Sequence, residues 1–278
     1  MKTLNIHNPF SALLKQGAPV FHAETVTSTM DVSKKLAGEG LPHGTVICAD
    51  FQEAGRGRGS ARQWQMEKMM SLPFTILLRY GQLENIPAAL TLRCGLAVSL
   101  ALEDIFSLYK KADANAAPVK VFVKWPNDII IDSKKAGGIL CESDGGNVYA
   151  GIGVNILQKR FPPRLSENAT SIALVIDNEQ LTINNEKNAR DFRFTLLEMI
   201  LIHLYNEIEI STDDSWRLRV EQRLYKKGAP VVFISGAADS GREVKGVIYG
   251  IGEGGELLII PDGKTAPCPF ITGELKIF

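Results

Sequence analysis

Residues 124–138 read KWPNDIIIDSKKAGG, and the rest of the chain can be interpreted outward from this stretch. The apolar, β-branched residues of segments 121–123 and 129–131 predict two buried strands. Because Pro126 between them has no backbone N–H, the hydrogen-bond ladder must break at this corner. One interpretation of the corner is a β-turn with a solvated lysine. The other is a break that points polar side chains into a pocket, namely Lys124, Asn127 and Asp128.

Composition excludes several classes of protein. The chain has 278 residues, of which 45% are hydrophobic, so it can bury the core of one large domain or of a large and a small one. Lys+Arg and Asp+Glu are equal at 31 each, so there is no global basic field to attract nucleic acid or a membrane surface. The N-terminus lacks signal-peptide features, and we expect no apolar run long enough to span a bilayer. We therefore expect a cytoplasmic protein with no DNA and no membrane partner.

The four cysteines give no sign of a metal site. Cys48, Cys94, Cys141 and Cys268 lie far apart in the sequence and match no CxxC or Cys/His zinc spacing. Because each stands among apolar or small neighbours, we expect buried thiols in a reducing compartment.

A loop rich in glycine and arginine follows the strand predicted at 45–51. Residues 52–64 read QEAGRGRGSARQW, which cannot pack as a regular element because glycine is flexible and the arginines repel one another. The loop is either a solvated surface segment or an anion clamp, and we favour the clamp. Its guanidinium groups, on Arg56, Arg58 and Arg62, suit a carboxylate or a phosphate. The spacing fits neither a Walker loop nor the GxGxxG fingerprint, so dinucleotide binding is not expected.

Two shorter motifs have both a structural and a functional interpretation. Ser28-Thr29 precedes a predicted helix, where a hydroxyl either caps the helix or faces a ligand at its N-terminus. Gly151 and Gly153 alternate along a predicted strand and so lie on one face of it. That face either packs on a helix or is cleared for a flat ligand, with the Asn155 amide at its end.

The hydrophobic pattern predicts an α+β region followed by a small all-β part. Helices are expected at residues 29–37, 86–106, 188–208 and 216–225, and strands at 20–24, 45–51, 72–78, 121–123, 129–131, 139–142, 148–156, 231–234, 243–249, 256–260 and near 275–278. A short basic turn is expected at Lys134-Lys135 and a hairpin turn at 144–147. We divide the chain into a leader at 1–19 with an amphipathic piece at Phe10–Leu14, a main domain at 20–227 and a barrel-like domain at 228–278.

Taken together, these motifs occur in an order that resembles the biotin–protein ligase family. They are Ser28-Thr29, Gln52 with Gly55-Arg56-Gly57-Arg58, Lys124-Trp125-Pro126-Asn127-Asp128, Lys135 with Gly137-Gly138, and Gly151-x-Gly153-x-Asn155. The KWPND run and the GRGR loop are specific in combination, although either alone is a weak signal. The resemblance covers the chain from about Val20 to its end. It implies a biotin/lipoate ligase fold related to class II aminoacyl-tRNA synthetases, a mixed β-sheet with helices packed on it, and a C-terminal SH3-like domain.

The resemblance also implies an activity and its residues. The family activates biotin with ATP and Mg²⁺ to biotinoyl-AMP and then transfers the acyl group to a lysine of a biotin carboxyl carrier domain. Biotin contacts are implied for Ser28, Thr29, Met30, Gln52, Arg56, Gly57, Arg58, Lys135, Gly151 and Gly153. Nucleotide contacts are implied for Arg56, Arg58, Lys124, Trp125, Asn127, Asp128 and Asn155. The candidate catalytic residues are Lys135 and Arg58, which oppose accumulating negative charge, and Asp128, which accepts a proton from the attacking amine. No side chain is assigned as a metal ligand.

The chain departs from the family pattern at two places. Gly59-Ser60-Ala61 looks like a local insertion, which leaves the equivalence of Arg62 open, and Met30 stands where asparagine is common. The N-terminal extension of about 20 residues is too short for a winged-helix DNA-binding domain, so we expect the monofunctional type without repressor activity. We expect the arginine loop to be mobile when empty.

Two rival functions are retained from the sequence. A lipoate–protein ligase would use the same fold, but Ser28, Thr29 and Gln52 favour the ureido group of biotin over an aliphatic tail. A non-enzymatic biotin-binding regulator is disfavoured because the arginine loop and Lys135 are both present. The sequence leaves open whether the chain forms a homodimer.

Overall fold

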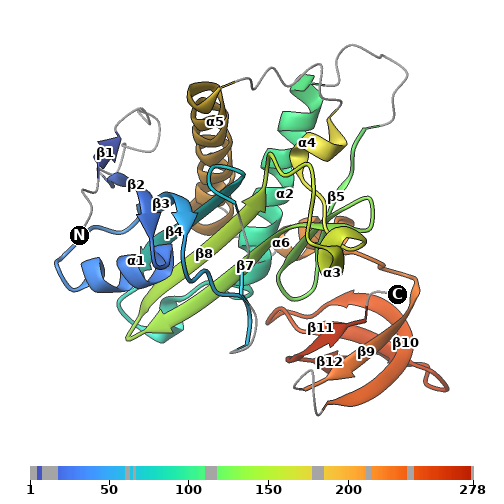
Figure 1. The fold of residues 1–278 in the computed structure, drawn as a ribbon. Helices are drawn as coiled ribbons and strands as arrows, with labels where there is room; N and C mark the ends of the chain where they lie inside the picture. Colours follow the sequence, from blue (N-terminus) through green and yellow to red (C-terminus); the bar gives the residue numbers. More distant parts are fainter. Residues whose placement is uncertain are drawn as a thin grey trace.

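The computed structural model describes residues 5–7, 18–59, 63–64, 67–109, 118–176, 185–210, 215–236 and 241–276. These residues form an eight-stranded sheet with helices on both of its faces and a separate five-stranded sheet at the C-terminal end (Figure 1). The predicted α+β fold, with a mixed sheet and a small C-terminal β part, is confirmed.

The large sheet is antiparallel except for one parallel pair. Its strands, in spatial order, are β1 (Asn5–His7), β2 (Val20–Val26), β3 (Thr45–Gln52), β4 (Ser71–Arg79), β8 (Asn147–Asn155), β7 (Lys134–Asp144), β6 (Asp128–Ile131) and β5 (Val121–Lys124). Strands β2 and β3 run parallel, and helix α1 (Thr29–Ala37) connects them, because parallel neighbours need a crossover. Part of the expected leader is therefore a strand, since β1 pairs antiparallel with β2. The predicted amphipathic piece at Phe10–Leu14 lies outside the described residues.

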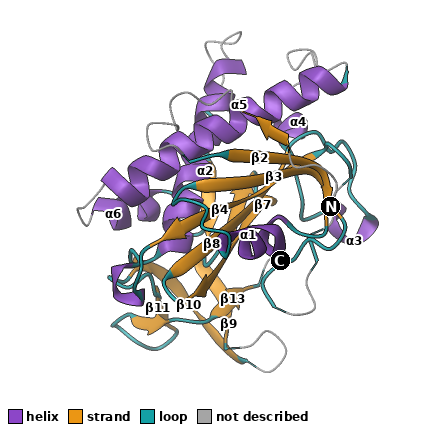
Figure 2. Ribbon diagram, turned by 90° about the vertical axis from the view of Figure 1, so that its left-hand side faces the viewer, coloured by secondary structure: helices purple, strands orange, loops and turns teal. Residues whose placement is uncertain are grey.

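Helices cover the two faces of this sheet unequally. The long helices α2 (Leu90–Tyr109) and α5 (Glu186–Tyr205) pack together on one face, and α1 lies on the other, as Figure 2 shows in side view. The alternation along β4 agrees with this, because Leu78 belongs to the main core with α2 whereas Leu77 packs in a small core with Met30 of α1. Thus α1 leaves much of its face uncovered, and the cavities described below are there.

The remaining helical elements are short. They are η2 (Leu83–Asn85), α3 (Pro163–Ser166), α4 (Ile172–Val175), the π-helical turn η3 (Asn206–Ile210) and α6 (Ser215–Gln222). The predicted start of the second helix at residue 86 was wrong, because α2 begins at Leu90 after Ala89 adopts a left-handed backbone with φ of 55°.

One described segment passes a length-and-hydropathy test for a membrane span, which contradicts the expectation that no apolar run would. Residues Leu83–Tyr109 have a mean hydropathy of 1.4 in their most apolar window, and 61% of that window is buried inside the protein. The buried part of this surface packs against α5 and strands β5, β6 and β7, as in the core helix of a folded domain.

The corner at residues 124–138 differs from the prediction in one respect. The expected basic turn at Lys134-Lys135 is wrong, since both lysines belong to strand β7. The turn consists of Asp132 and Ser133, whose φ angles are 48° and 64°, a conformation that short polar side chains tolerate better than lysine.

The C-terminal sheet contains one strand more than predicted. Its order is β12 (Cys268–Phe270), β11 (Leu257–Pro261), β10 (Arg242–Ile251), β9 (Pro230–Ser235) and β13 (Gly273–Leu275), with every pair antiparallel. The sequence prediction missed β12 because its CPF sequence contains a proline, which is depleted in strands.

The thiols are only partly as predicted. All four cysteines are free, and Cys48 and Cys94 are buried, but Cys141 and Cys268 are partly exposed. Burial raises the pKa of the Cys48 thiol to about 12, so this thiol is inert at neutral pH.

Candidate active site

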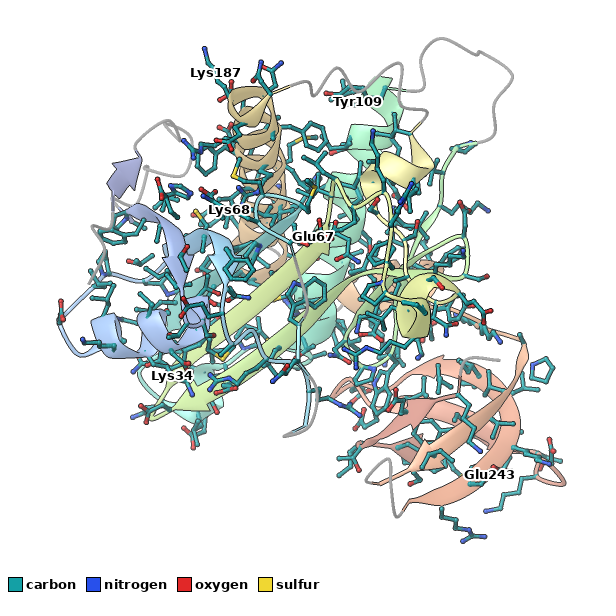
Figure 3. The ribbon with its side chains drawn as sticks, in the orientation of Figure 1. Lys34, Glu67, Lys68, Tyr109, Lys187 and Glu243 are labelled. Atoms are coloured by element: carbon teal, nitrogen blue, oxygen red, sulfur yellow. The ribbon has the colours of Figure 1, made fainter. Side chains whose placement is uncertain are left out.

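Two adjoining cavities occupy the face of the large sheet that α1 leaves open. The first has a volume of about 430 Å³ and is lined by the N-terminus of α1, the arginine loop and strands β4, β7 and β8. The second, of about 620 Å³, extends from the end of β3 toward the segment after β8 and reaches Glu274 of the C-terminal sheet. Figure 3 labels Glu67, which lines the second cavity, near the upper end of strand β8. Six residues line both cavities: Gln52, Gln63, Trp64, Asp128, Lys135 and Leu165.

An ion pair stands at the junction of the cavities. Lys135 Nζ lies 2.5 Å from Asp128 Oδ1, and the two side chains are 37% and 16% exposed. A bulge between Ile129 and Ile130 brings the two residues together across strands β6 and β7. Gly138 leaves space for the pair, since a Cβ there would lie 3.5 Å from Lys135 Nζ and 3.7 Å from Asp128 Oδ1.

Backbone hydrogen bonds hold Lys135 in this orientation. Its N–H donates to the Asn168 carbonyl at 2.8 Å, and its carbonyl accepts from Thr170 N at 2.9 Å. Because successive residues of a strand face opposite sides, the neighbouring Lys134 points away and is exposed. The two lysines, which are equivalent by composition, are therefore distinguished by strand register.

Polar groups at the start of α1 form a buried cluster in the first cavity. Ser28 caps the helix by accepting from Met30 N, which is the structural one of the two roles that the sequence left open. Thr29 donates to Gln52 Oε1 through both its N–H, at 2.8 Å, and its Oγ1, at 3.0 Å. Thr29 Oγ1 also lies 2.9 Å from Thr75 Oγ1. The sequence analysis did not predict Thr75 as a site residue. The signal available for it was a single threonine within the apolar sequence of β4.

The glycine face of β8 is covered by two side chains. A Cβ at Gly151 would lie 2.8 Å from Met30 Cε, and one at Gly153 would lie 2.8 Å from the Trp64 ring. The glycines thus allow α1 and the end of the arginine loop to approach the backbone closely, which favours the packing interpretation of this face. Trp64 was not predicted as a site residue, and its buried indole Nε1 has no partner among the described residues.

The arginine loop is tied to protein acceptors at both described guanidinium groups. Arg56 Nη2 lies 2.6 Å from Asp31 Oδ1 of α1 and 3.9 Å from Glu142 Oε1 of β7. Arg58 Nη2 donates to the Gly273 carbonyl of the C-terminal sheet at 2.6 Å. Arg62 and the predicted insertion residues Ser60 and Ala61 lie outside the described residues.

The corner residues divide between cavities and structural contacts. Lys124 is buried and lines the second cavity, as does Asn155, whereas Asn127 lines the first. Asn127 Nδ2 donates to the Ile139 carbonyl at 2.8 Å, which locks the corner onto β7. Trp125 lies outside the linings of both cavities: its Nε1 donates to the Gly255 carbonyl at 2.9 Å and its ring packs 5.9 Å from Phe233. The structure thus gives Trp125 a role in joining the two sheets.

A buried ionic cluster fixes strand β3 two residues before Gln52. Asp50 Oδ1 lies 2.5 Å from Arg193 Nη1 of α5 and 2.8 Å from His22 Nε2 of β2. Burial by itself raises the pKa of the Asp50 carboxyl, but the hydrogen bonds from His22 and Arg193 outweigh burial and lower this pKa to about 2. The carboxylate is therefore charged at neutral pH and joins strands β2 and β3 to helix α5.

The described residues contain no group of three or more His, Cys, Asp or Glu side chains arranged to hold a metal ion. The carboxylates that line the second cavity are Glu53, Glu67, Asp128 and Glu274. A set of this kind fits Mg²⁺, which proteins commonly bind through one or two carboxylates together with substrate phosphates.

Comparison with known proteins agrees with this architecture. Residues 22–158 match the model of the biotin/lipoate A/B protein ligase family. The chain belongs to this family. Among curated family members, it is 34% identical over 165 residues to the bifunctional ligase/repressor BirA of Bacillus subtilis, covering 56% of this chain and 47% of that protein. It is 27% identical over 269 residues to BirA of Escherichia coli, covering 94% of this chain and 74% of that protein. The chain thus spans about half the length of the Bacillus relative.

Solved structures of ligases show the same fold. Biotin protein ligase from Aquifex aeolicus in complex with biotin and ATP superposes with a TM-score of 0.70 at 25% identity, over 92% of this chain and 97% of that one. Biotin protein ligase from Leishmania major in complex with biotinyl-5-AMP gives a TM-score of 0.60 at 27% identity, over 90% and 98% of the two chains. The family predicted from the sequence motifs is confirmed.

Proposed function

We propose that this chain is an ATP-dependent biotin–protein ligase. It converts biotin and ATP to biotinoyl-5′-AMP and pyrophosphate, and then transfers the biotinoyl group to a lysine of a biotin carboxyl carrier domain. The observation that carries the proposal is the Lys135–Asp128 ion pair at the junction of two cavities. A reaction between two bound substrates needs such a junction, where their reactive groups meet.

The first cavity suits biotin. Thr29, Gln52 and Thr75 form a buried hydrogen-bonding cluster at one end of it, which fits a small ring with polar atoms. The second cavity suits ATP, with Lys124, Asn155 and several carboxylates in its lining. The positions of Lys124 and Asn155 support their assignment to the nucleotide, whereas Arg56, Arg58 and Asn127 line the first cavity and Trp125 lines neither. The names of the relatives, which include biotin–[acetyl-CoA-carboxylase] ligases of Mycobacterium tuberculosis and Paracoccus denitrificans, support the proposed activity.

The chemistry of the first step follows from charge. A biotin carboxylate oxygen attacks the α-phosphorus of ATP, a P–O bond forms, and the bond to the pyrophosphate oxygen breaks. Both reactants are anions, so a cation placed at the junction offsets the charge that accumulates between them. Lys135 is that cation, and Arg58 joins it after exchanging the Gly273 carbonyl for phosphate. Mg²⁺ supplies further neutralisation of the phosphates when it is bound.

In the second step the carrier lysine amine attacks the acyl carbon of biotinoyl-AMP. The new C–N bond replaces the bond to the AMP oxygen, AMP leaves, and the amine must lose one proton. Asp128 accepts this proton in the proposed mechanism, because its carboxylate already lies at the junction beside Lys135.

The setting of the reaction is proposed along with it. The acceptor is the carrier domain of a biotin-dependent carboxylase, and the protein works in the cytoplasm without a DNA or membrane partner. Equal numbers of acidic and basic residues support the absence of a nucleic-acid partner. We also retain the division into a leader at 1–19, a catalytic domain at 20–227 and an SH3-like domain at 228–278.

The proposal is tested by two linked assays on the whole chain. With ATP and MgCl₂ present, we expect pyrophosphate release that depends on biotin and not on lipoate. Labelled biotin should then appear covalently on a purified carrier domain, and omission of ATP should abolish the labelling. Release that depends on lipoate alone, or no biotin-dependent release at all, would overturn the proposed function.

A further inference from the structure

Gln158 is a buried residue in the lining of the second cavity to which the sequence motifs assign no role. It follows β8 by three residues and is 6% exposed. Its Nε2 donates to Ser71 Oγ and lies 3.5 Å from Asn155 Oδ1. Its Oε1 is buried and has no hydrogen-bond partner among the described residues.

The orientation of the Gln158 amide is set by a chain of hydrogen bonds. The Thr170 carbonyl can only accept, so Asn155 must turn Nδ2 toward it, and the two atoms lie 3.0 Å apart. Asn155 therefore presents Oδ1, an acceptor, to Gln158. The Gln158 amide must then turn its Nε2 donor toward Asn155. The amide oxygen of Gln158 is thereby left as the group without a partner.

The surroundings of Gln158 hold it rigidly in this position. Ser171 Oγ donates to the Gln158 carbonyl at 2.6 Å, and the partner residue Ser71 is itself fully buried. The Ser71 carbonyl accepts from Arg193 Nε at 2.9 Å, which joins Gln158 to the Asp50 cluster. A buried and fixed acceptor without a partner destabilises the protein unless some group donates a hydrogen bond to it. A cavity wall is where a ligand can do so.

We propose that Gln158 Oε1 accepts a hydrogen bond from the exocyclic amino group of the nucleotide base and so selects a 6-aminopurine over a 6-oxopurine. This inference rests on the proposed function, in which the second cavity takes ATP. The phosphates belong near Lys135 and Asp128 at the junction, whereas Gln158 lines only the second cavity. Phe161 and Pro162, which line that cavity as well, offer flat apolar surfaces to a purine ring.

The selectivity follows from donor and acceptor chemistry. A 6-amino group presents N–H toward Gln158 Oε1, whereas a 6-oxo group presents a second acceptor and leaves both oxygens without a donor. A site built to hydrogen-bond a ligand N–H rejects the analogue that lacks it, because its own polar group stays unpaired.

The test compares ATP with purine riboside triphosphate, which lacks only the 6-amino group, and with ITP, which carries a 6-oxo group. The readout is kcat/KM for biotin-dependent pyrophosphate release by the wild type and by Gln158→Met. We expect the wild type to favour ATP over purine riboside triphosphate by about tenfold and over ITP by more. In Gln158→Met both ratios should fall to within about threefold of one, because every base then meets an apolar side chain.

Each ratio is measured within one protein, so a variant that is only partly folded does not distort it. Gln63→Met is the matched control, since Gln63 is the same residue type in the same cavity lining but is exposed, and it should keep the preference for ATP.

Unchanged ratios in Gln158→Met, or a wild type that does not discriminate between ATP and purine riboside triphosphate, would overturn the inference while pyrophosphate release with ATP still supported the ligase. A wild type without such release would instead refute the proposed function. A contact from Gln158 to the ribose would leave the ratios unaffected, because all three substrates carry the same sugar.

Discussion

Lys135→Ala is expected to lower biotin-dependent pyrophosphate release by about 10²–10³-fold. Lys135 Nζ stands at the junction of the two cavities, 2.5 Å from Asp128, where two anions must meet in the first step. Removing one group that stabilises accumulating charge in a preorganised site typically costs this much in rate. The measurement is the steady-state rate of pyrophosphate release with saturating ATP and biotin, and the loss should fall mainly on kcat.

Lys134→Ala is the matched control for this experiment. Lys134 is adjacent in sequence, identical in chemistry and exposed on the opposite side of β7, so its removal should change the rate by less than about twofold. Thermal unfolding of both variants is expected to resemble that of the wild type, because the Lys135–Asp128 pair is partly solvated and contributes little to stability. Equal rates for wild type and Lys135→Ala would remove this lysine from the catalytic residues.

Asp50→Asn should lower the free energy of unfolding by about 3–5 kcal/mol at pH 7. The substitution leaves the guanidinium of Arg193, which is 1% exposed, without its buried carboxylate partner. His22 loses the same partner. Urea unfolding at pH 7 measures the effect, and Asp104→Asn is the matched control. Asp104 also pairs with a histidine, His203, but the Asp104 side chain is 55% exposed. Replacing Asp104 should therefore lower the free energy of unfolding by less than about 1 kcal/mol.

The difference in stability between the wild type and Asp50→Asn should depend on pH in a defined direction. The pKa of Asp50 is lowered from 3.8 to about 2 by folding, so the carboxylate stabilises the folded state fully above about pH 4. That contribution is lost as the pH falls from about 4 toward 2 and the carboxylate takes up a proton. The stability difference between wild type and Asp50→Asn should therefore narrow over this range. A difference that stays constant down to pH 3, or grows, would show that the carboxylate does not carry the effect.

The sequence alone was sufficient for the family, because local motifs carried that information. KWPND and GRGR are motifs that are specific in combination, and Ser28 caps α1 in one of the two roles that the sequence allowed. The spacing of apolar residues also predicted most strands and both long helices. A strand or helix that buries one face has apolar residues at a regular spacing in the sequence. The errors were at element ends, such as the start of α2 at Leu90, and in the short strands β1 and β12, which were missed.

What the sequence did not reveal depends on contacts between distant segments. Gln158 follows a strand and resembles a loop residue, and only the fold brings it between Ser71 and Asn155 at a cavity wall. Asp50 reads as one acidic residue in an apolar strand, and its value to stability depends on Arg193, which is 143 residues away. Trp125 sits inside the most specific motif of the chain, yet the structure turns it toward the C-terminal sheet.

The lysine pair at residues 134–135 shows where the division falls. The sequence by itself determined the family, the α+β fold and the presence of a cation next to a glycine pair, because residue types and spacing are local properties. It could favour Lys135 over Lys134 only by resemblance. Tertiary structure decided between them physically: the bulge in β6–β7 and the hydrogen bonds to Asn168 and Thr170 set the register, and register determines which side chain faces the cavities.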